Sequence, residues 1–237
     1  AFGAVNTDLE ITAYISRLGN TIVQAASESP SNFEFFLVTD KSVNAFAMPG
    51  GYIGVHTGLI AASQTESELA SVLAHEVGHV TQRHIARRFG QQKQTSLVAT
   101  AAMIAALLVA GSNPQAASGL MAAGAGYSID QQLSFSRDAE READRVGFLT
   151  LQQAGFDTQG MVDFFGRLQT ASRLYENNAP SYLRTHPLTT ERIADIRNRA
   201  GLESSSNRSQ NQSSLEFELI RVKSIVFAER SNQQLAD

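Results

Sequence analysis

The sequence predicts an α+β fold that is mostly helical, with a small antiparallel sheet beside one central helix. Three observations favour this class. The chain has 237 residues, enough for one domain with a sizeable buried core. Its 43% hydrophobic and 18% charged residues are typical of a globular protein. Short β-branched and aromatic segments gather between residues 33 and 56, whereas helical spacing of apolar residues dominates the rest of the chain.

Charge and cysteine content exclude several classes of function. The net charge is -4, and no basic stripe is present that would neutralise phosphates, so we expect no nucleic-acid partner. The chain has no cysteine, which excludes disulfides, thiolate zinc sites, iron–sulfur clusters and cysteine nucleophiles. Any metal ion must therefore be bound by His, Asp or Glu.

The chain begins with an amphipathic helix. Thr7 and Glu10 form a capping-box pattern, and apolar residues follow at helical spacing from Ile11 to Ile22. We expect this helix to serve packing.

The sheet is predicted from three short segments, 33–39, 44–48 and 52–56. The turn residues Pro49-Gly50-Gly51 separate the last two, and a polar turn separates the first two. Alternation of aromatic and β-branched residues around such turns predicts an antiparallel arrangement.

A second capping box, Thr65 with Glu68, starts the helix with the strongest pattern, which we expect to stop at Gly90. The following region, Ser96–Tyr127, is rich in Ala, Gly, Ser and Met and predicts a helical pair that is tightly packed or mobile. Its apolar stretch Leu97–Gly111 is shorter than the roughly 20 residues that a membrane-spanning helix needs. We therefore expect a buried or surface-lying helix there.

The remaining elements are mostly helical. The expected order is a charged helix 130–153 that Gly155 stops, a helix around residues 161–168, a loop 179–187, a helix 190–200 and a helix 215–229. The Ser/Asn/Gln-rich stretch between the last two predicts a linker. The expected domains are residues 1–201, a polar linker 202–214, and a C-terminal segment 215–237 that starts a further helical region.

The segment His75-Glu76-Val77-Gly78-His79 lies inside the strongest helical pattern. Residues four apart differ by about 40° around a helix axis, so both imidazoles project from one face and can bind one cation. Glu76 lies about 100° round from His75, beside that cation, where it can act as a general base. The alternative is two surface histidines on an amphipathic helix.

A hydrolytic zinc ion needs a third protein ligand and one open position. His84 lies about 140° from His79 around the helix and cannot reach the same ion. The segment 140–144 supplies a carboxylate, and Glu140 and Asp144 share a helical face. We expect Glu140 to bind the ion and Asp144 to hydrogen-bond the far nitrogen of a ligand histidine. The alternative is an exposed charged face among neighbouring arginines.

These motifs resemble the gluzincin metallopeptidase family of HtpX and the CaaX prenyl proteases. The segments Asn44–Gly58 and His186–Arg192 are similar to the soluble periplasmic BepA-like branch of that family, and the resemblance covers roughly residues 9–199. It implies a zincin-like metalloprotease domain with one zinc ion per chain. By this resemblance the ligands are His75, His79 and Glu140, and Glu76 is the general base.

The resemblance also implies a zinc endopeptidase that cleaves unfolded or misassembled proteins in envelope quality control in the bacterial periplasm. Outer-membrane assembly partners follow from it, and peripheral membrane contact stays open. The segment 52–56 would offer an edge strand to an extended peptide through Tyr52, Ile53, Gly54, Val55 and His56. The alternative for these residues is ordinary strand surface.

Two further residues are candidates for stabilising the oxyanion that develops in the transition state. His186 precedes Pro187 in a loop, and Arg192 follows in the next helix. His186 has two alternatives: it can occupy the open position of the zinc and silence the enzyme, or simply cap the next helix. The Gly-containing segment 112–127 is a candidate lid over the cleft.

Two other functions share these residues. A zinc-containing chaperone or assembly factor with little or no proteolysis would have no use for Glu76, which binds no metal. A zinc hydrolase of non-peptide amides would need no edge strand.

Overall fold

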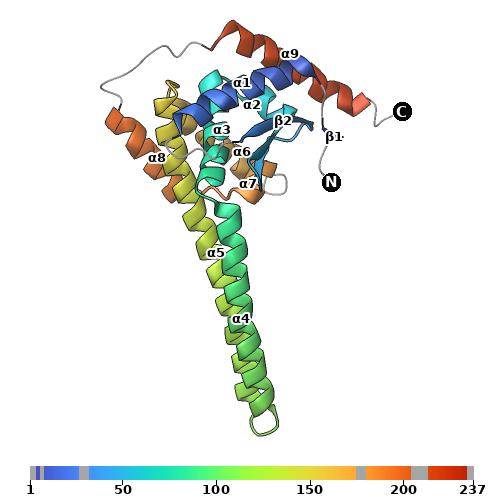
Figure 1. The fold of residues 1–237 in the computed structure, drawn as a ribbon, viewed down its shortest axis with the longest axis vertical. Coiled ribbons are helices and arrows are strands. Elements are labelled where there is room, and N and C mark those ends of the chain that lie inside the picture. The colour runs from blue at the N-terminus through green and yellow to red at the C-terminus, as the bar shows by residue number, and fades with distance from the viewer. Residues whose placement is uncertain (1–3, 6–7, 27–31, 175–179, 204–212, 234–237) are drawn as a thin grey trace. The chain divides into compact units, whose positions relative to one another are not determined.

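The computed structural model describes residues 4–5, 8–26, 32–174, 180–203 and 213–233 (Figure 1). The chain forms two compact units, residues 1–82 with 141–237 and residues 83–140. The first unit combines a sheet with helices, and the second is helical throughout. The predicted α+β class, mostly helical, is confirmed.

The first unit contains the sheet and most of the helices. Its elements are β1 (Ala4–Val5), α1 (Leu9–Ala25), β2 (Glu34–Thr39), β3 (Ala45–Met48), β4 (Tyr52–His56), α2 (Thr57–Ala62), α3 (Glu66–Thr81), the last part of α5 (Pro114–Gln153), α6 (Gln159–Leu174), α7 (Ser181–Thr185), α8 (Thr190–Glu203) and α9 (Leu215–Gln233). The second unit contains α4 (His84–Ala110) and the first part of α5.

The sheet is mixed, which corrects the antiparallel expectation in part. The strand order is β1-β2-β4-β3. The hairpin of β3 and β4 is antiparallel as expected, and its turn uses Gly50 and Gly51 at φ of 94° and 88°. However, β2 pairs with β4 in parallel, with Phe35 opposite Ile53. After β2 the chain forms β3 one strand further along the sheet. The hairpin then returns β4 into the position between β2 and β3, where it runs parallel to β2.

The expectation that residues 52–56 form an edge strand is wrong. The strand β4 is interior, because β2 pairs along one side of it and β3 along the other. Both edges of β4 are paired within the chain, so no peptide can add to this strand, and Ile53 and Val55 are fully buried in the core. Among the described strands, the free edge near the motif helix belongs to β3, which contacts α3.

The helix α3 is buried along nearly its whole length. It packs against α1, α6 and β3, and its apolar residues Leu69, Val72, Leu73 and Val77 are fully buried. Thr65 caps its start by accepting a hydrogen bond from the Glu68 amide, as expected. Its end differs from the prediction: α3 stops at Thr81, and Arg83 adopts a left-handed φ of 54° before α4 begins.

The two terminal helices pack in the same unit. Asp8 caps α1 by accepting from the Ile11 amide, whereas Thr7, the expected cap, lies outside the described residues. The helix α9 contacts α2 and α1 and buries Phe217 and Ile220, so its apolar face has partners within this unit. Most of the expected linker 202–214 lies outside the described residues.

The second unit is an antiparallel pair of helices, α4 and the first part of α5, joined at residues 111–113 (Figure 1). Gln91 reaches the Gln131 carbonyl, and Arg87 lies over the Phe135 ring, which fixes the pairing of the two helices. By length and composition, the helix α4 is long and apolar enough to cross a membrane, and most of its apolar part is exposed. Of the two alternatives expected for this region, a buried or a surface-lying helix, the buried one is wrong, and the surface-lying one is not excluded.

Candidate metal centre

The helix α3 presents His75, Glu76 and His79 in the interior of the first unit. The exposed fractions of the three residues are 0%, 0% and 9%. As the four-residue spacing requires, the two imidazoles lie on one face, and their Nε2 atoms are 3.0 Å apart. Burial of two polar rings on an apolar helix is costly unless a partner satisfies their nitrogens.

Close backbone contact between α3 and α5 determines where the acidic residues of α5 lie. A Cβ atom added at Gly147 would lie 3.0 Å from the Cα of His75, and one added at Gly78 would lie 3.1 Å from the carbonyl oxygen of Ala143. A Cβ at either position would be tighter than nearly all real Cβ contacts, so glycine favours this close approach. Glu140 lies one turn before Ala143 on the same helix, so its carboxylate is carried toward the two histidines.

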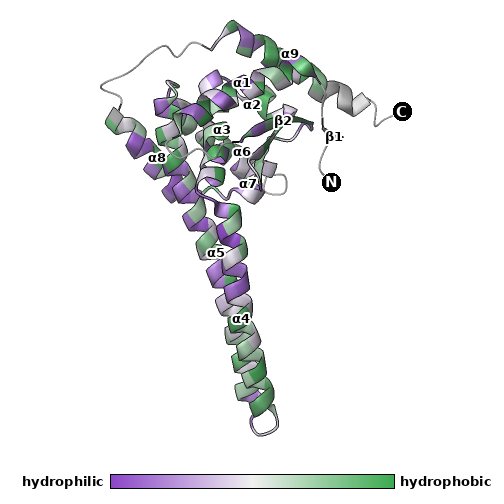
Figure 2. Cartoon of the chain, viewed as in Figure 1, coloured by the Kyte–Doolittle hydropathy of each residue, from purple (hydrophilic) through white to green (hydrophobic). Residues whose placement is uncertain are grey.

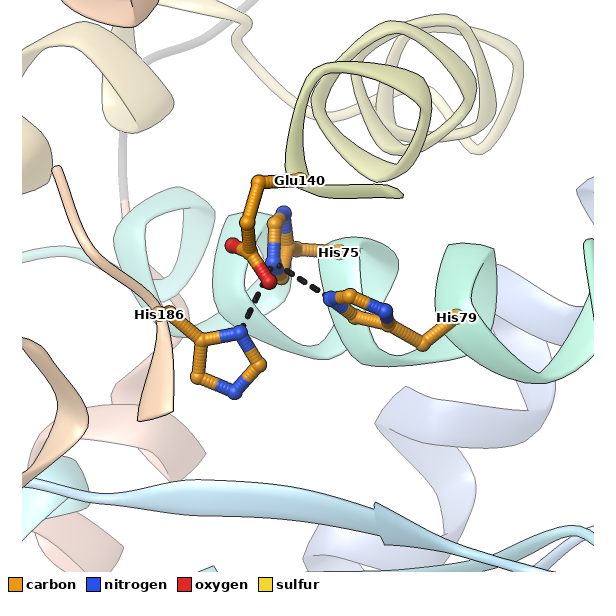
Figure 3. A group of neighbouring side chains, drawn as sticks. All are labelled: His75, His79, Glu140 and His186. Carbon is orange, nitrogen blue, oxygen red and sulfur yellow. Dashed lines mark hydrogen bonds between the residues drawn. The ribbon is translucent and has the colours of Figure 1, made fainter. Parts of the chain in front are cut away.

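Four potential ligand atoms converge, from His75, His79, Glu140 and His186, and all lie within 4.8 Å of one another (Figure 3). All four residues are buried. With Zn–N bonds of about 2.0–2.1 Å, tetrahedral ligands lie about 3.3 Å apart. The observed separations of 3.0 Å and 3.4 Å between the histidine nitrogens are close to this value.

His186, the fourth member of the group, directly follows α7. The Tyr182 amide donates to the Val43 carbonyl, which fixes α7 beside the start of β3, and the Tyr182 ring stacks on His186 with centroids 4.5 Å apart. The Nδ1 atom of His186 lies 3.4 Å from the His75 Nε2, and its Nε2 lies 3.4 Å from the Glu76 Oε1. The same imidazole therefore faces both a ligand nitrogen and the expected base.

Glu76 places a carboxylate in the protein interior, where its desolvation is unfavourable. It is fully buried, and neither carboxylate oxygen has a hydrogen-bond partner among the residues that the structure describes. A buried carboxylate is stable only when something polar completes its surroundings. Two imidazoles, one carboxylate and an adjacent unsatisfied carboxylate fit a hydrolytic zinc ion, whose ligands are His and Glu and whose remaining position is open to reactants.

Asp144 supports the site from behind. Its Oδ1 lies 3.0 Å from the His75 Nδ1, and it accepts hydrogen bonds from the Arg192 Nε and Nη2 at 2.6 Å and 2.7 Å. Burial raises the pKa of Asp144, but the hydrogen bonds from Arg192 and His75 outweigh it, so the pKa lies below its ordinary value. An ionised Asp144 holds the His75 Nδ1 proton, which leaves the Nε2 lone pair for a metal.

Arg192 lies behind the ligands. Its fork binds Asp144, and its Nη1 donates to the Pro187 carbonyl at 2.6 Å. The guanidinium is buried, and these contacts favour a positioning role over the expected contact with an oxyanion. Sequence reasoning missed the pair of Asp144 and Arg192. A chemical argument could have indicated it: a carboxylate expected to lie behind a metal ligand needs a cationic partner when it is buried.

The remaining candidates lie outside the group. His84 is buried but is not among the four residues that converge. The expected reason, its angle on the helix of His79, does not apply, because α3 ends at Thr81 and His84 begins α4. Glu142 is half-buried on another face of α5. His56 lies in the core, where its Nδ1 is 3.0 Å from the Ser42 hydroxyl. Burial lowers the pKa of His56, and the nearby Asp40 carboxylate offsets this only in part. Such burial favours the neutral imidazole and a structural role.

Comparison with known proteins identifies related sequences. The model of peptidase family M48 matches residues 10–200. The chain is 42% identical to the beta-barrel assembly-enhancing protease of Yersinia pestis and 40% identical to that of Escherichia coli strain K12, over 80% of this chain and 39% of each relative. It is 32% identical to the metalloprotease LoiP of Escherichia coli strain K12, over 80% of this chain and 69% of that relative.

The extent of these matches shows the family. The matched region includes the motif helix α3, the acidic segment of α5 and the loop of His186, which are the three parts of the chain that form the site. The chain spans about 40% of the length of the two assembly-enhancing proteases. On this evidence, the chain belongs to peptidase family M48.

Proposed function

We propose that this protein is a zinc endopeptidase that cleaves extended segments of polypeptide. The observation that carries the proposal is the convergence of His75, His79, Glu140 and His186 beside the buried Glu76. Two histidines and one glutamate are the ligand set of a well-known class of hydrolytic zinc sites. A structural zinc site would have no use for an uncoordinated carboxylate such as Glu76 beside its ligands.

Each residue then has a defined task. Bound zinc would supply a Lewis acid that polarises the scissile carbonyl and activates water at neutral pH. Glu76 accepts the proton from the attacking water and passes it to the departing amine. Asp144 keeps His75 in the tautomer that exposes the Nε2 lone pair, and Arg192 keeps Asp144 ionised. The free edge of β3 binds the substrate backbone as an added strand, in place of the interior β4.

The substrates and the location follow from the relatives. Two of them are named beta-barrel assembly-enhancing proteases, so we propose that this protein acts on unfolded or misassembled polypeptides in the bacterial periplasm, with outer-membrane assembly factors as partners. Strand addition supports this class of substrate, because only an unfolded segment offers free backbone groups to β3. A chaperone with the same zinc site remains the second candidate.

The proposed function is tested by metal content and cleavage together. We expect the purified chain to contain one zinc ion and to cleave casein, and a chelator to reduce cleavage by on the order of 100-fold or more. Adding back one equivalent of zinc should restore the rate. Zinc-containing protein that suppresses casein aggregation without cleaving it would support the chaperone, and cleavage of small amides alone would support the non-peptide hydrolase.

A single substitution separates the two candidate roles of His186. We propose that it fills the fourth ligand position in the resting protein, because its Nδ1 belongs to the converging group. His186→Ala should then raise casein cleavage several-fold at unchanged zinc content, since the position becomes free for the reactants. A fall in kcat with unchanged KM would instead assign His186 to the oxyanion, and an unchanged rate would exclude both roles.

A further inference from the structure

The helical pair of the second unit buries small residues and exposes large ones. Its buried or contacting positions include Ala106, Ala117 and Gly124, and a Cβ added at Gly124 would lie 2.7 Å from the Ala102 Cβ. Its large apolar residues are exposed instead, with Leu107 at 70% and Leu108 at 80%. The others are Phe89, Leu97, Val98, Met103, Ile104, Leu120, Met121, Tyr127, Ile129 and Leu133. In water such a pair would bury its large residues, whereas helices in lipid contact one another through small ones.

The pair is also free of charge over most of its length. No charged residue occurs from Gln94 to Ile129, and Figure 2 shows the apolar colouring on both helices toward the connecting turn. The start of α4 is basic: Arg87, Arg88 and Lys93 are exposed, and no acidic residue precedes Asp130 in this unit. An apolar segment that ends at a group of cations complements the hydrocarbon layer and the anionic headgroups of a membrane.

Five hydroxyl side chains of this segment are compatible with an apolar solvent. The hydroxyls of Thr95, Ser96 and Thr100 each donate to a backbone carbonyl of the preceding helical turn. Ser112 and Ser118 do the same at the connecting turn and in α5. A hydroxyl that is satisfied within its own helix costs much less to transfer out of water than a free one.

The dimensions agree with a bilayer. The uncharged part of α4, residues 94–110, has 17 residues. At about 1.5 Å per residue it is about 25 Å long, against about 30 Å for the hydrocarbon core. The exposed large residues of α4 spread over roughly 220° of its circumference at about 100° per residue, so one flat protein surface cannot cover them all. A fluid lipid phase can.

We propose that the second unit inserts into a lipid bilayer from the connecting turn, with residues 94–129 in the hydrocarbon and Arg87, Arg88 and Lys93 at anionic headgroups. The turn residues Ser112 and Asn113 then reach the far part of the bilayer. This inference concerns the helical pair alone and does not depend on the zinc chemistry.

The absence of tryptophan from the chain permits a direct test. Trp is introduced singly at Met103 and at Leu97, and at Leu215 on α9 as a matched control with an exposure of 77%. With phosphatidylcholine–phosphatidylglycerol vesicles, Met103→Trp should shift to the blue and be quenched most by bromine near the acyl-chain ends. Leu97→Trp should be quenched most by bromine near the headgroups, and Leu215→Trp by neither. Equal responses of Met103→Trp and Leu215→Trp would overturn the proposal.

Charge variants provide the second arm. Leu107→Asp with Leu108→Asp should reduce vesicle binding by on the order of 100-fold or more, because carboxylates must enter the hydrocarbon. The control Leu215→Asp with Leu219→Asp places the same charges on exposed positions of α9 and should bind as wild type. Circular dichroism checks that both proteins stay folded. A blue shift without vesicles that tracks a dimer in sedimentation would assign the surface to a second copy and refute insertion.

Discussion

Glu76→Gln is expected to lower kcat/KM for casein cleavage by about 1,000-fold while leaving the zinc content at one ion per chain. Gln has nearly the shape of Glu but cannot accept a proton at neutral pH. Glu76 is not one of the four converging ligands, so its replacement removes the base without removing a ligand. The measurement is steady-state cleavage beside metal analysis of the same preparation.

The control is Glu142→Gln, which makes the same chemical change at a half-buried carboxylate of α5 outside the group. It should cleave at the wild-type rate. Glu76→Gln protein with full activity would remove Glu76 from the mechanism. Protein that has lost its zinc would show instead that this carboxylate holds the ion, and the site would then resemble a structural one.

The sequence predicted most of the helices, because their boundaries are encoded locally. Thr65 caps α3 and Gly155 follows the end of α5 at a φ of 82°, and both signals lie within a few residues of the backbone groups that they serve. The direction of β2 was not encoded in this way. It depends on which strand lies beside it after the chain has passed through β3, and no short pattern specifies that neighbour.

The site shows the same division between local and distant information. The spacing of His75 and His79 places both rings on one helical face, so this part was predictable from the period of a helix. The role of Arg192 was not, because it depends on the pairing with Asp144, which is 48 residues away in the chain. Without knowledge that Asp144 is buried, nothing in the sequence indicates that it needs the guanidinium.

This pairing leads to the second large effect, that of Asp144→Asn. We expect the substitution to destabilise the metal-free protein by about 3 kcal/mol, because Arg192 stays buried without its counterion. Zinc affinity should also fall by about 10–100-fold, because the amide no longer holds the His75 Nδ1 proton as a carboxylate does. Denaturant unfolding with a chelator present measures the first effect, and competition with a zinc indicator measures the second.

A double-mutant cycle separates these two effects. Arg192→Met removes the buried cation, so the double variant Asp144→Asn/Arg192→Met should regain part of the stability lost by Asp144→Asn alone. Its zinc affinity should stay low, because the carboxylate behind His75 is still missing. Additive losses of stability would show that the two residues are not coupled, despite the hydrogen bonds of 2.6 Å and 2.7 Å between them. Recovery of zinc affinity in the double variant would show that Asp144 acts on the ligands only through Arg192, and that the position of the guanidinium, rather than the tautomer of His75, limits metal binding.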